Sequence, residues 1–130
     1  MNDEPRPPIS RRSLLGLGAL LFAVSTAQTW WVGRNDTRLG GNVAALAGPG
    51  DIRMLSSENC AVCLRARQWL VQHRVPFKEC LIEQDAVCRQ TLTATGLTGT
   101  PVFLVRGRPQ LGFSPQALER ALQPGPPPAP

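Results

Sequence analysis

Two cysteines separated by two residues, Cys60-Ala61-Val62-Cys63, constrain the fold of this 130-residue chain more than any other feature. Apolar residues at helical spacing follow the pair, so we expect the cysteines to open a helix. Cysteines this close can form a disulfide, and the unpaired N–H groups at a helix N-terminus stabilise a thiolate there. Zinc sites use the same spacing, so the pair by itself leaves a redox site and a metal site open.

The apolar patterning around the cysteine pair predicts one small α/β domain over residues 51–123. We expect strands at 52–55, 77–82, 102–105 and 110–113, and helices at 60–73, 85–95 and 115–122. Gly96 is placed to end the second helix, and Ser114 with Pro115 to begin the last one. The predicted order of elements is therefore β-α-β-α-β-β-α, with a turn at 106–109.

This order and three short motifs resemble the glutaredoxin family. The motifs are the C-x-x-C after the first strand, Gly99-Thr100-Pro101-Val102 before the third, and Leu111-Gly112-Phe113-Ser114 before the last helix. The resemblance covers residues 51–123. It implies a thioredoxin-like α/β fold: a four-stranded mixed sheet with flanking helices, in which the first two strands are parallel and the last two form a hairpin.

The same resemblance implies a thiol–disulfide oxidoreductase and assigns its residues. Cys60 matches the catalytic nucleophile and Cys63 the resolving thiol, which agrees with the position of Cys60 at the helix start. Pro101 matches a cis-proline that presents Thr100 to a substrate peptide, so both residues are expected to bind substrate. Gly112 and Phe113 return to the same end of the sheet and are expected to bind substrate too, although Phe113 could instead be a core aromatic.

Three positions differ from the pattern of glutathione-binding members of the family. Ala61-Val62 replaces Pro-Tyr between the cysteines, Ser57 stands where a lysine is common, and Gly112-Phe113-Ser114 replaces Gly-Gly followed by an acidic residue. We therefore expect glutathione to be a poor partner and protein disulfides or thiols to be the substrates. No tightly bound cofactor is expected, only an external thiol reductant: a thioredoxin-type system or glutathione.

Cys80 and Cys88 form the second pair of cysteines. The predicted strand and helix place them at comparable heights, so they could form a structural disulfide. They could equally be two unpaired thiols, and a zinc site of all four cysteines is a further alternative. The second pair lacks the C-x-x-C spacing, so we expect no metal. Four cysteines in so small a domain also suggest an oxidising compartment.

The N-terminal part of the chain is expected to carry the domain to or through a membrane. Residues 1–13 are polar, residues 14–33 carry no charge and are long enough to span a bilayer, and Trp30-Trp31 would lie at the far interface. Either this segment is a single-pass anchor in the inner membrane with the domain outside the cytoplasm, or it is a signal cleaved after Ala27. Residues 34–50 are predicted to be a flexible linker, and residues 124–130 a Pro-rich tail.

The formal net charge of +5 does not indicate a nucleic-acid-binding protein, because no basic stripe is interleaved with aromatic residues. Arg106, Arg108 and His73 are expected to be surface residues. Two other function classes stay open: a structural zinc-binding or partner-binding module on the same scaffold, and a cytosolic glutathione-dependent glutaredoxin. The uncharged segment at 14–33 argues against the cytosolic alternative.

Overall fold

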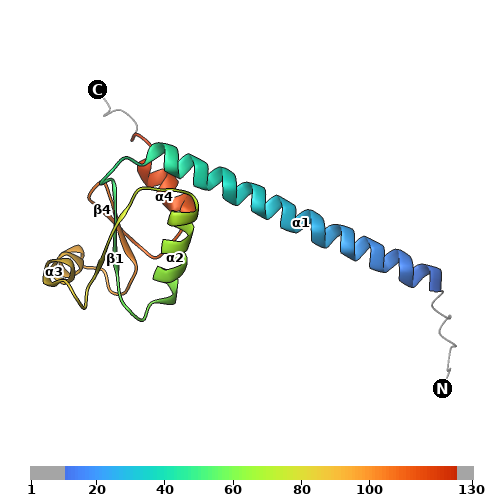
Figure 1. The fold of residues 1–130 in the computed structure, drawn as a ribbon, viewed down its shortest axis with the longest axis horizontal. Coiled ribbons are helices and arrows are strands. Elements are labelled where there is room, and N and C mark those ends of the chain that lie inside the picture. The colour runs from blue at the N-terminus through green and yellow to red at the C-terminus, as the bar shows by residue number, and fades with distance from the viewer. Residues whose placement is uncertain (1–10, 126–130) are drawn as a thin grey trace, which may run out of the picture. The chain divides into compact units, whose positions relative to one another are not determined.

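The computed structural model describes residues 11–125 and divides the chain into two units, Met1–Asp36 and Thr37–Pro130. Helix α1 (Arg11–Leu46) contributes to both units (Figure 1). The second unit continues with β1 (Ile52–Ser56), α2 (Ala61–Gln72), β2 (Lys78–Leu81), α3 (Ala86–Thr95), β3 (Val102–Val105), β4 (Arg108–Leu111) and α4 (Pro115–Leu122). The predicted N-terminal region and tail lie outside the described residues over 1–10 and 126–130.

The four strands form one sheet in the order β2-β1-β3-β4. Strand β1 pairs in parallel with β2, with Leu55 opposite Cys80, and antiparallel with β3, with Leu55 opposite Val102. Strands β3 and β4 form an antiparallel hairpin. The predicted mixed sheet and element order are therefore confirmed.

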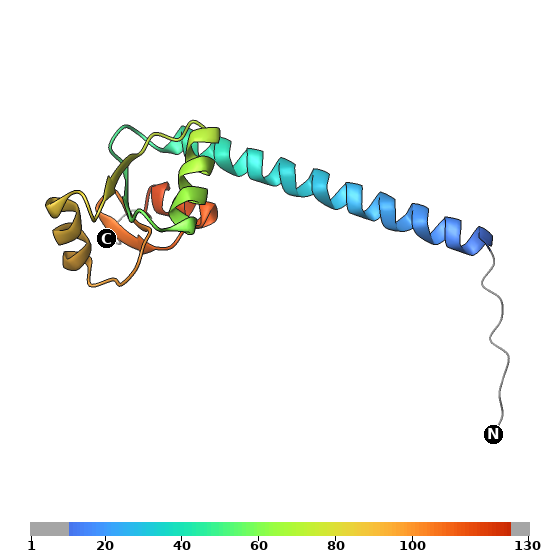
Figure 2. The same cartoon turned by 60° about the horizontal axis from the view of Figure 1, so that its bottom comes forward.

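Helices cover both faces of the sheet: α2 and α4 lie on one face, and α3 lies alone on the other (Figures 1 and 2). Alternate residues of each strand point to opposite faces, so each strand contributes to two separate cores. The larger core lies under α2 and α4, and its fully buried members include Met54, Leu70, Phe103 and Leu118. The smaller core, under α3, is built around Leu55, Cys88 and Val102.

The last strand begins and ends two residues earlier than predicted. Arg106 and Gly107 both have positive φ, 49° and 80°, which is the conformation of a two-residue hairpin turn whose twist matches the strands. The turn therefore closes at once, and Val105 pairs with Arg108. Gly112, with φ 80°, then ends the strand. Pro109 is tolerated because β4 is an edge strand.

The expectation of a flexible linker over residues 34–50 is wrong for most of that segment. Helix α1 continues to Leu46, and Val43 and Ala47 belong to the larger core. Asn42 donates a hydrogen bond from Nδ2 to Glu119 Oε1 on α4, at 2.7 Å. Gly40 is buried, and a Cβ built on it would lie 2.1 Å from Nδ1 of His73. Glycine therefore serves close packing here, not flexibility.

The described part of the first unit exposes large apolar side chains on the helix. They are Leu15, Leu17, Leu20, Leu21, Phe22, Val24, Trp30, Trp31 and Val32. By length and composition the helix could cross a membrane over Leu15–Leu46, and a signal sequence would meet the same test. The guanidinium of Arg34 lies 4.1 Å from the centre of the Trp30 ring, a cation–π contact one turn along the helix.

Candidate redox site

The Cys60–Cys63 disulfide lies at the N-terminus of α2. Cys60 is the N-cap residue, and its Sγ accepts a hydrogen bond from the backbone N–H of Cys63 at 3.0 Å. The two sulfurs are bonded to each other at 2.10 Å. Cys60 is partly exposed, whereas Cys63 is only 1% exposed. The structure thus gives Cys60 the position where a helix N-terminus stabilises a thiolate and where another thiol can approach.

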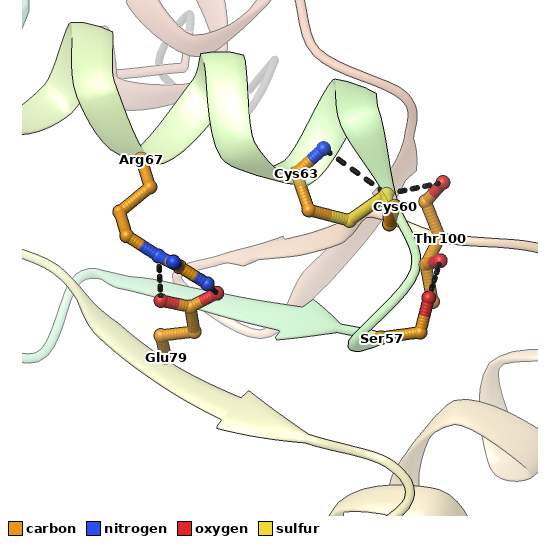
Figure 3. The surroundings of a disulfide bond; sticks show 6 residues. All are labelled: Ser57, Cys60, Cys63, Arg67, Glu79 and Thr100. Atoms are coloured by element: carbon orange, nitrogen blue, oxygen red, sulfur yellow. Dashed lines mark hydrogen bonds and ion pairs between the residues drawn. A yellow bond between two sulfur atoms is a disulfide. The ribbon is translucent and has the colours of Figure 1, made fainter.

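The Thr100–Pro101 peptide bond is cis, as predicted, and it lies against the disulfide. The carbonyl oxygen of Thr100 is 3.5 Å from Sγ of Cys60 (Figure 3). In the disulfide this is a contact without a proton, since neither sulfur carries a hydrogen; in the reduced protein the thiol of Cys60 could donate to that carbonyl. Pro101 is fully buried, while Thr100 is partly exposed.

Two hydrogen bonds hold the cis-proline segment in place. Ser57, in the loop before Cys60, shares a hydrogen bond with the Thr100 hydroxyl at 2.9 Å between oxygens (Figure 3). The N–H of Gly112 donates to the carbonyl of Pro101 at 2.9 Å, so Gly112 joins the site from the end of β4. The sequence analysis did not predict the role of Ser57, because a loop serine carries no signal of its distant partner.

Phe113 contributes to the core, which is the second of the two interpretations given above. Its ring lies 5.7 Å from that of Trp69 in an edge arrangement and 6.0 Å from that of Phe103, and it packs against the larger core. His73, expected to be a surface residue, is partly buried, and its ring lies 4.5 Å from that of Trp69.

An open groove of about 380 Å³ runs beside the disulfide along α2. Its lining combines the loop before α2 with one side of the helix: Ser57, Glu58, Asn59, Cys60, Ala61, Leu64 and Arg67. Leu64 is 49% exposed one turn after Cys60, so the groove offers an apolar contact next to the reactive sulfur. Such a groove can take an extended peptide segment, and the sulfur of Cys60 lies within its lining.

Arg67 and Glu79 form a bidentate ion pair between α2 and β2. Nε and Nη2 of Arg67 donate to the two carboxylate oxygens of Glu79 at 2.6 and 2.7 Å (Figure 3). Burial raises the pKa of Glu79, but the hydrogen bond from Arg67, the nearby Ser56 hydroxyl and the guanidinium charge outweigh burial, and the net pKa is lowered. The Ser56 hydroxyl is buried and faces the carboxylate without a well-aligned hydrogen bond. The same pair raises the pKa of Arg67.

Cys80 and Cys88 form the second disulfide, with sulfurs 2.04 Å apart. It joins edge strand β2 to α3 and belongs to the smaller core. Glu79, the residue before Cys80, points to the opposite face, toward α2. The two disulfides therefore lie on opposite faces of the sheet, and this separation is incompatible with a zinc site of all four cysteines. Within residues 11–125, no other group of three His, Cys, Asp or Glu is arranged to hold a metal ion.

Arg106 has a structural role that the sequence analysis missed. Its guanidinium donates to Asp51 Oδ2 and to the carbonyls of Leu46 and Leu122. One turn residue thus joins the end of α1, the start of β1 and the end of α4. The hydrogen bond from Arg106 is the main cause of the lowered pKa of Asp51, with a smaller contribution from the N–H of Gly48. Arginine in a tight turn gave no sequence signal for these distant partners.

Comparisons with known proteins place the domain in a family. Residues 52–109 match the family model for glutaredoxin. The crystal structure of the thioredoxin-like protein BC3987 is similar with a TM-score of 0.50 and 22% identity, over 54% of this chain and 97% of that one. A mutant of BC3987 gives 0.51 and 23%, over 56% and 95%. The glutaredoxin from Archaeoglobus fulgidus gives 0.48 and 19%, over 57% and 87%. No curated protein matches the chain.

Proposed function

We propose, from the premise that residues 52–109 form a glutaredoxin-like domain of thioredoxin-like fold, that this chain is a membrane-attached thiol–disulfide oxidoreductase acting on protein substrates. One observation carries the proposal: Sγ of Cys60 lies at the N-cap of α2, partly exposed, in contact with the carbonyl of a cis-proline segment. This arrangement provides an accessible sulfur, a means of stabilising its thiolate, and a backbone edge beside it.

The proposed reaction is disulfide exchange in two steps. The Cys60 thiolate attacks one sulfur of a substrate disulfide, so that a mixed disulfide forms and the other substrate sulfur leaves as a thiolate. The Cys63 thiolate then attacks Sγ of Cys60, which releases the second substrate thiolate and closes the Cys60–Cys63 disulfide. An external thiol, oxidised in turn, returns the pair to the reduced state. The direction reverses when the substrate is a dithiol and the pair is oxidised.

Thr100 and Gly112 are proposed to position the substrate chain. The cis bond and the contact with Cys60 place the Thr100 backbone next to the reacting sulfur, where an extended segment of substrate could pair with it. The hydrogen bond from Gly112 to Pro101 and the one between Ser57 and Thr100 keep this segment fixed. Positioning of this kind speeds exchange by aligning the three sulfurs.

Glutathione is proposed to be a poor reductant, and the surroundings of Ser57 support this. Ser57 is engaged with Thr100 and offers no positive charge beside Cys60. The groove contains one cation, Arg67, and its charge is neutralised by Glu79. An anionic tripeptide therefore gains little from this surface, and a thioredoxin-type protein reductant fits it better.

The membrane attachment rests on the first unit of the chain. The exposed apolar side chains of Leu15–Val32 favour a bilayer over water, and the contact of Arg34 with Trp30 supplies an aromatic and a cationic group where interfaces favour both. The domain is proposed to lie outside the cytoplasm, either tethered or, after cleavage behind Ala27, soluble. The Cys80–Cys88 disulfide supports an oxidising compartment.

Disulfide reduction by purified variants tests the proposal. Cys60→Ser should abolish turnover of a protein disulfide substrate, and Cys63→Ser should lower turnover strongly while a mixed disulfide accumulates on Cys60. The paired replacement Cys80→Ala with Cys88→Ala is the control: it removes two cysteines on the other face and should leave exchange chemistry at Cys60 in place. Turnover that survives in Cys60→Ser would refute the proposed function.

A further inference from the structure

Two grooves meet at the Arg67–Glu79 pair. The groove beside Cys60 has Arg67 at its far end, and a second open groove of about 320 Å³ is lined by Arg67, Glu79, Cys80, Leu81, Gln84 and Asp85. Arg67 belongs to both linings. Figure 3 shows it on the same side of α2 as the disulfide, with its guanidinium on Glu79.

The charges along these grooves are unequal. The linings contain three carboxylates, from Glu58, Glu79 and Asp85, and one guanidinium, that of Arg67. Glu58 accepts a hydrogen bond from the side-chain amide of Gln84, which keeps this carboxylate at the entrance beside Cys60 without neutralising it. Because Glu79 cancels the charge of Arg67, the surface that leads away from Cys60 is negative.

Arg67 is within reach of a substrate attached to Cys60. Seven residues of helix separate the two, two turns or roughly 10 Å along the axis. An extended peptide advances about 3.5 Å per residue, so the side chain two residues from a substrate cysteine can approach this distance. Arg67 is 42% exposed and Glu79 17%, so the cation is the more accessible partner and would attract an anion if its carboxylate were removed.

We propose that Glu79 determines the charge specificity of the Cys60 groove by neutralising Arg67, so that the site favours neutral or basic segments next to the substrate cysteine and disfavours acidic ones. This inference rests on the proposed function and adds a specificity-determining residue that does not itself touch the reacting sulfurs. It names the substrate class as cysteine-containing protein segments with a neutral or basic residue near the cysteine.

Three matched peptides test it: acetyl-Cys-Gly-X-amide with X as Glu, Gln or Lys. Each is used as a thiol against the oxidised full-length protein in detergent. The peptide thiolate attacks Sγ of Cys60, forms a mixed disulfide and displaces Cys63 as a thiolate; a second peptide thiolate then releases the peptide disulfide and leaves both cysteines reduced. Acid quenching, alkylation and peptide mass spectrometry give the rate of opening of the Cys60–Cys63 bond separately from that of Cys80–Cys88.

The ratio of the Glu-peptide rate to the Gln-peptide rate is the readout, because differences in peptide thiol acidity cancel when protein variants are compared. Glu79→Gln should raise this ratio roughly three- to tenfold, and Arg67→Gln should lower it, since the carboxylate of Glu79 then acts alone. The double variant should show no rise. At about 1 M salt the differences should disappear, because screening acts within roughly 3 Å.

Glu119→Gln is the matched control: it makes the same change in net charge on α4, and the amide oxygen can still accept the hydrogen bond from Asn42. If the ratio shifts equally in Glu79→Gln and Glu119→Gln, or if the rise persists in the double variant, the inference is wrong. Failure of the proposed function has a different signature. In that case the Gln and Lys peptides would open the wild-type disulfide no faster than they open it in urea.

Discussion

The sulfurs of Cys60 and Cys63 have different surroundings, although only two residues separate them. Sγ of Cys60 accepts the N–H of Cys63, contacts the Thr100 carbonyl and is partly exposed; Cys63 is almost completely buried. A helix N-terminus lowers the free energy of a thiolate at the cap position more than one turn inside the helix. The attacking role of Cys60 therefore follows from its position as cap residue.

Glu79 gives a prediction about pH at the residue scale. Its pKa in the folded protein is lowered from the ordinary value of 4.5, so the folded state binds this proton less readily than the unfolded state does. The pair with Arg67 thus stabilises the fold fully above that ordinary value, and the stabilisation is lost as pH falls through the lowered pKa.

Glu79→Gln should therefore destabilise the domain by about 1 kcal/mol at pH 7, a modest figure because Arg67 is well exposed to solvent and screened. The difference from wild type should shrink as pH falls below 4.5. Denaturant unfolding of both proteins between neutral and acidic pH measures this. A difference that stays constant, or grows, on acidification would contradict the assignment.

Among the helices, the last turns of α1 are the least expected part of the domain. A sequence with Gly40-Gly41 and Gly48-Pro49-Gly50 is typical of a linker, yet Val43 is fully buried and Gly40 lies against His73. Local composition cannot reveal a contact between residues that are 33 positions apart (from 40 to 73). The same limit hid the Arg106 hydrogen bonds and the exact start of β4, whose position depends on the φ angles of the turn.

Gly40 and Gly41 offer a matched pair of substitutions. Gly40→Ala would place a methyl group 2.1 Å from the His73 ring and should destabilise the domain by roughly 1–3 kcal/mol. Gly41 has nothing within 4 Å of the added carbon, so Gly41→Ala should stabilise the helix by up to about 1 kcal/mol. Thermal unfolding of the full chain in detergent compares them.

The double variant Gly40→Ala with His73→Ala completes this test, because removal of the ring makes room for the methyl group. It should recover part of the stability that Gly40→Ala loses. Equal stability of Gly40→Ala and Gly41→Ala would show that α1 does not pack against α2 in this way.

At the scale of the whole molecule, sequence patterns predicted the domain well because its defining signals are local. The C-x-x-C motif, Thr100-Pro101, the cap residues and the alternation of the strands each act within a few residues, and the structure confirms the elements they predict. What could not be predicted depends on distant partners: the choice of the core for Phe113, the ion pair of Arg67, and the docking of α1.

The topology of the chain gives a prediction at this scale. A reporter fused after Pro130 should be active only outside the cytoplasm. Recovery of the activity in the membrane fraction would indicate the anchor, and recovery in the soluble exported fraction would indicate cleavage after Ala27. The physical reason is the uncharged, apolar helix preceded by Arg11 and Arg12, since segments of this length partition into bilayers. Activity confined to the cytoplasm would contradict both forms.

Trapping of substrates on the Cys63→Ser variant in intact cells tests the central claim most directly. Without the resolving thiol, the mixed disulfide with Cys60 cannot be closed, so rapid alkylation followed by non-reducing electrophoresis should show protein adducts that a reductant removes and that map to Cys60. Cys60→Ser in the same background should show none. If Cys63→Ser forms no adducts, or forms them on Cys80 or Cys88, then Cys60 is not the attacking thiol of an oxidoreductase and the account is wrong.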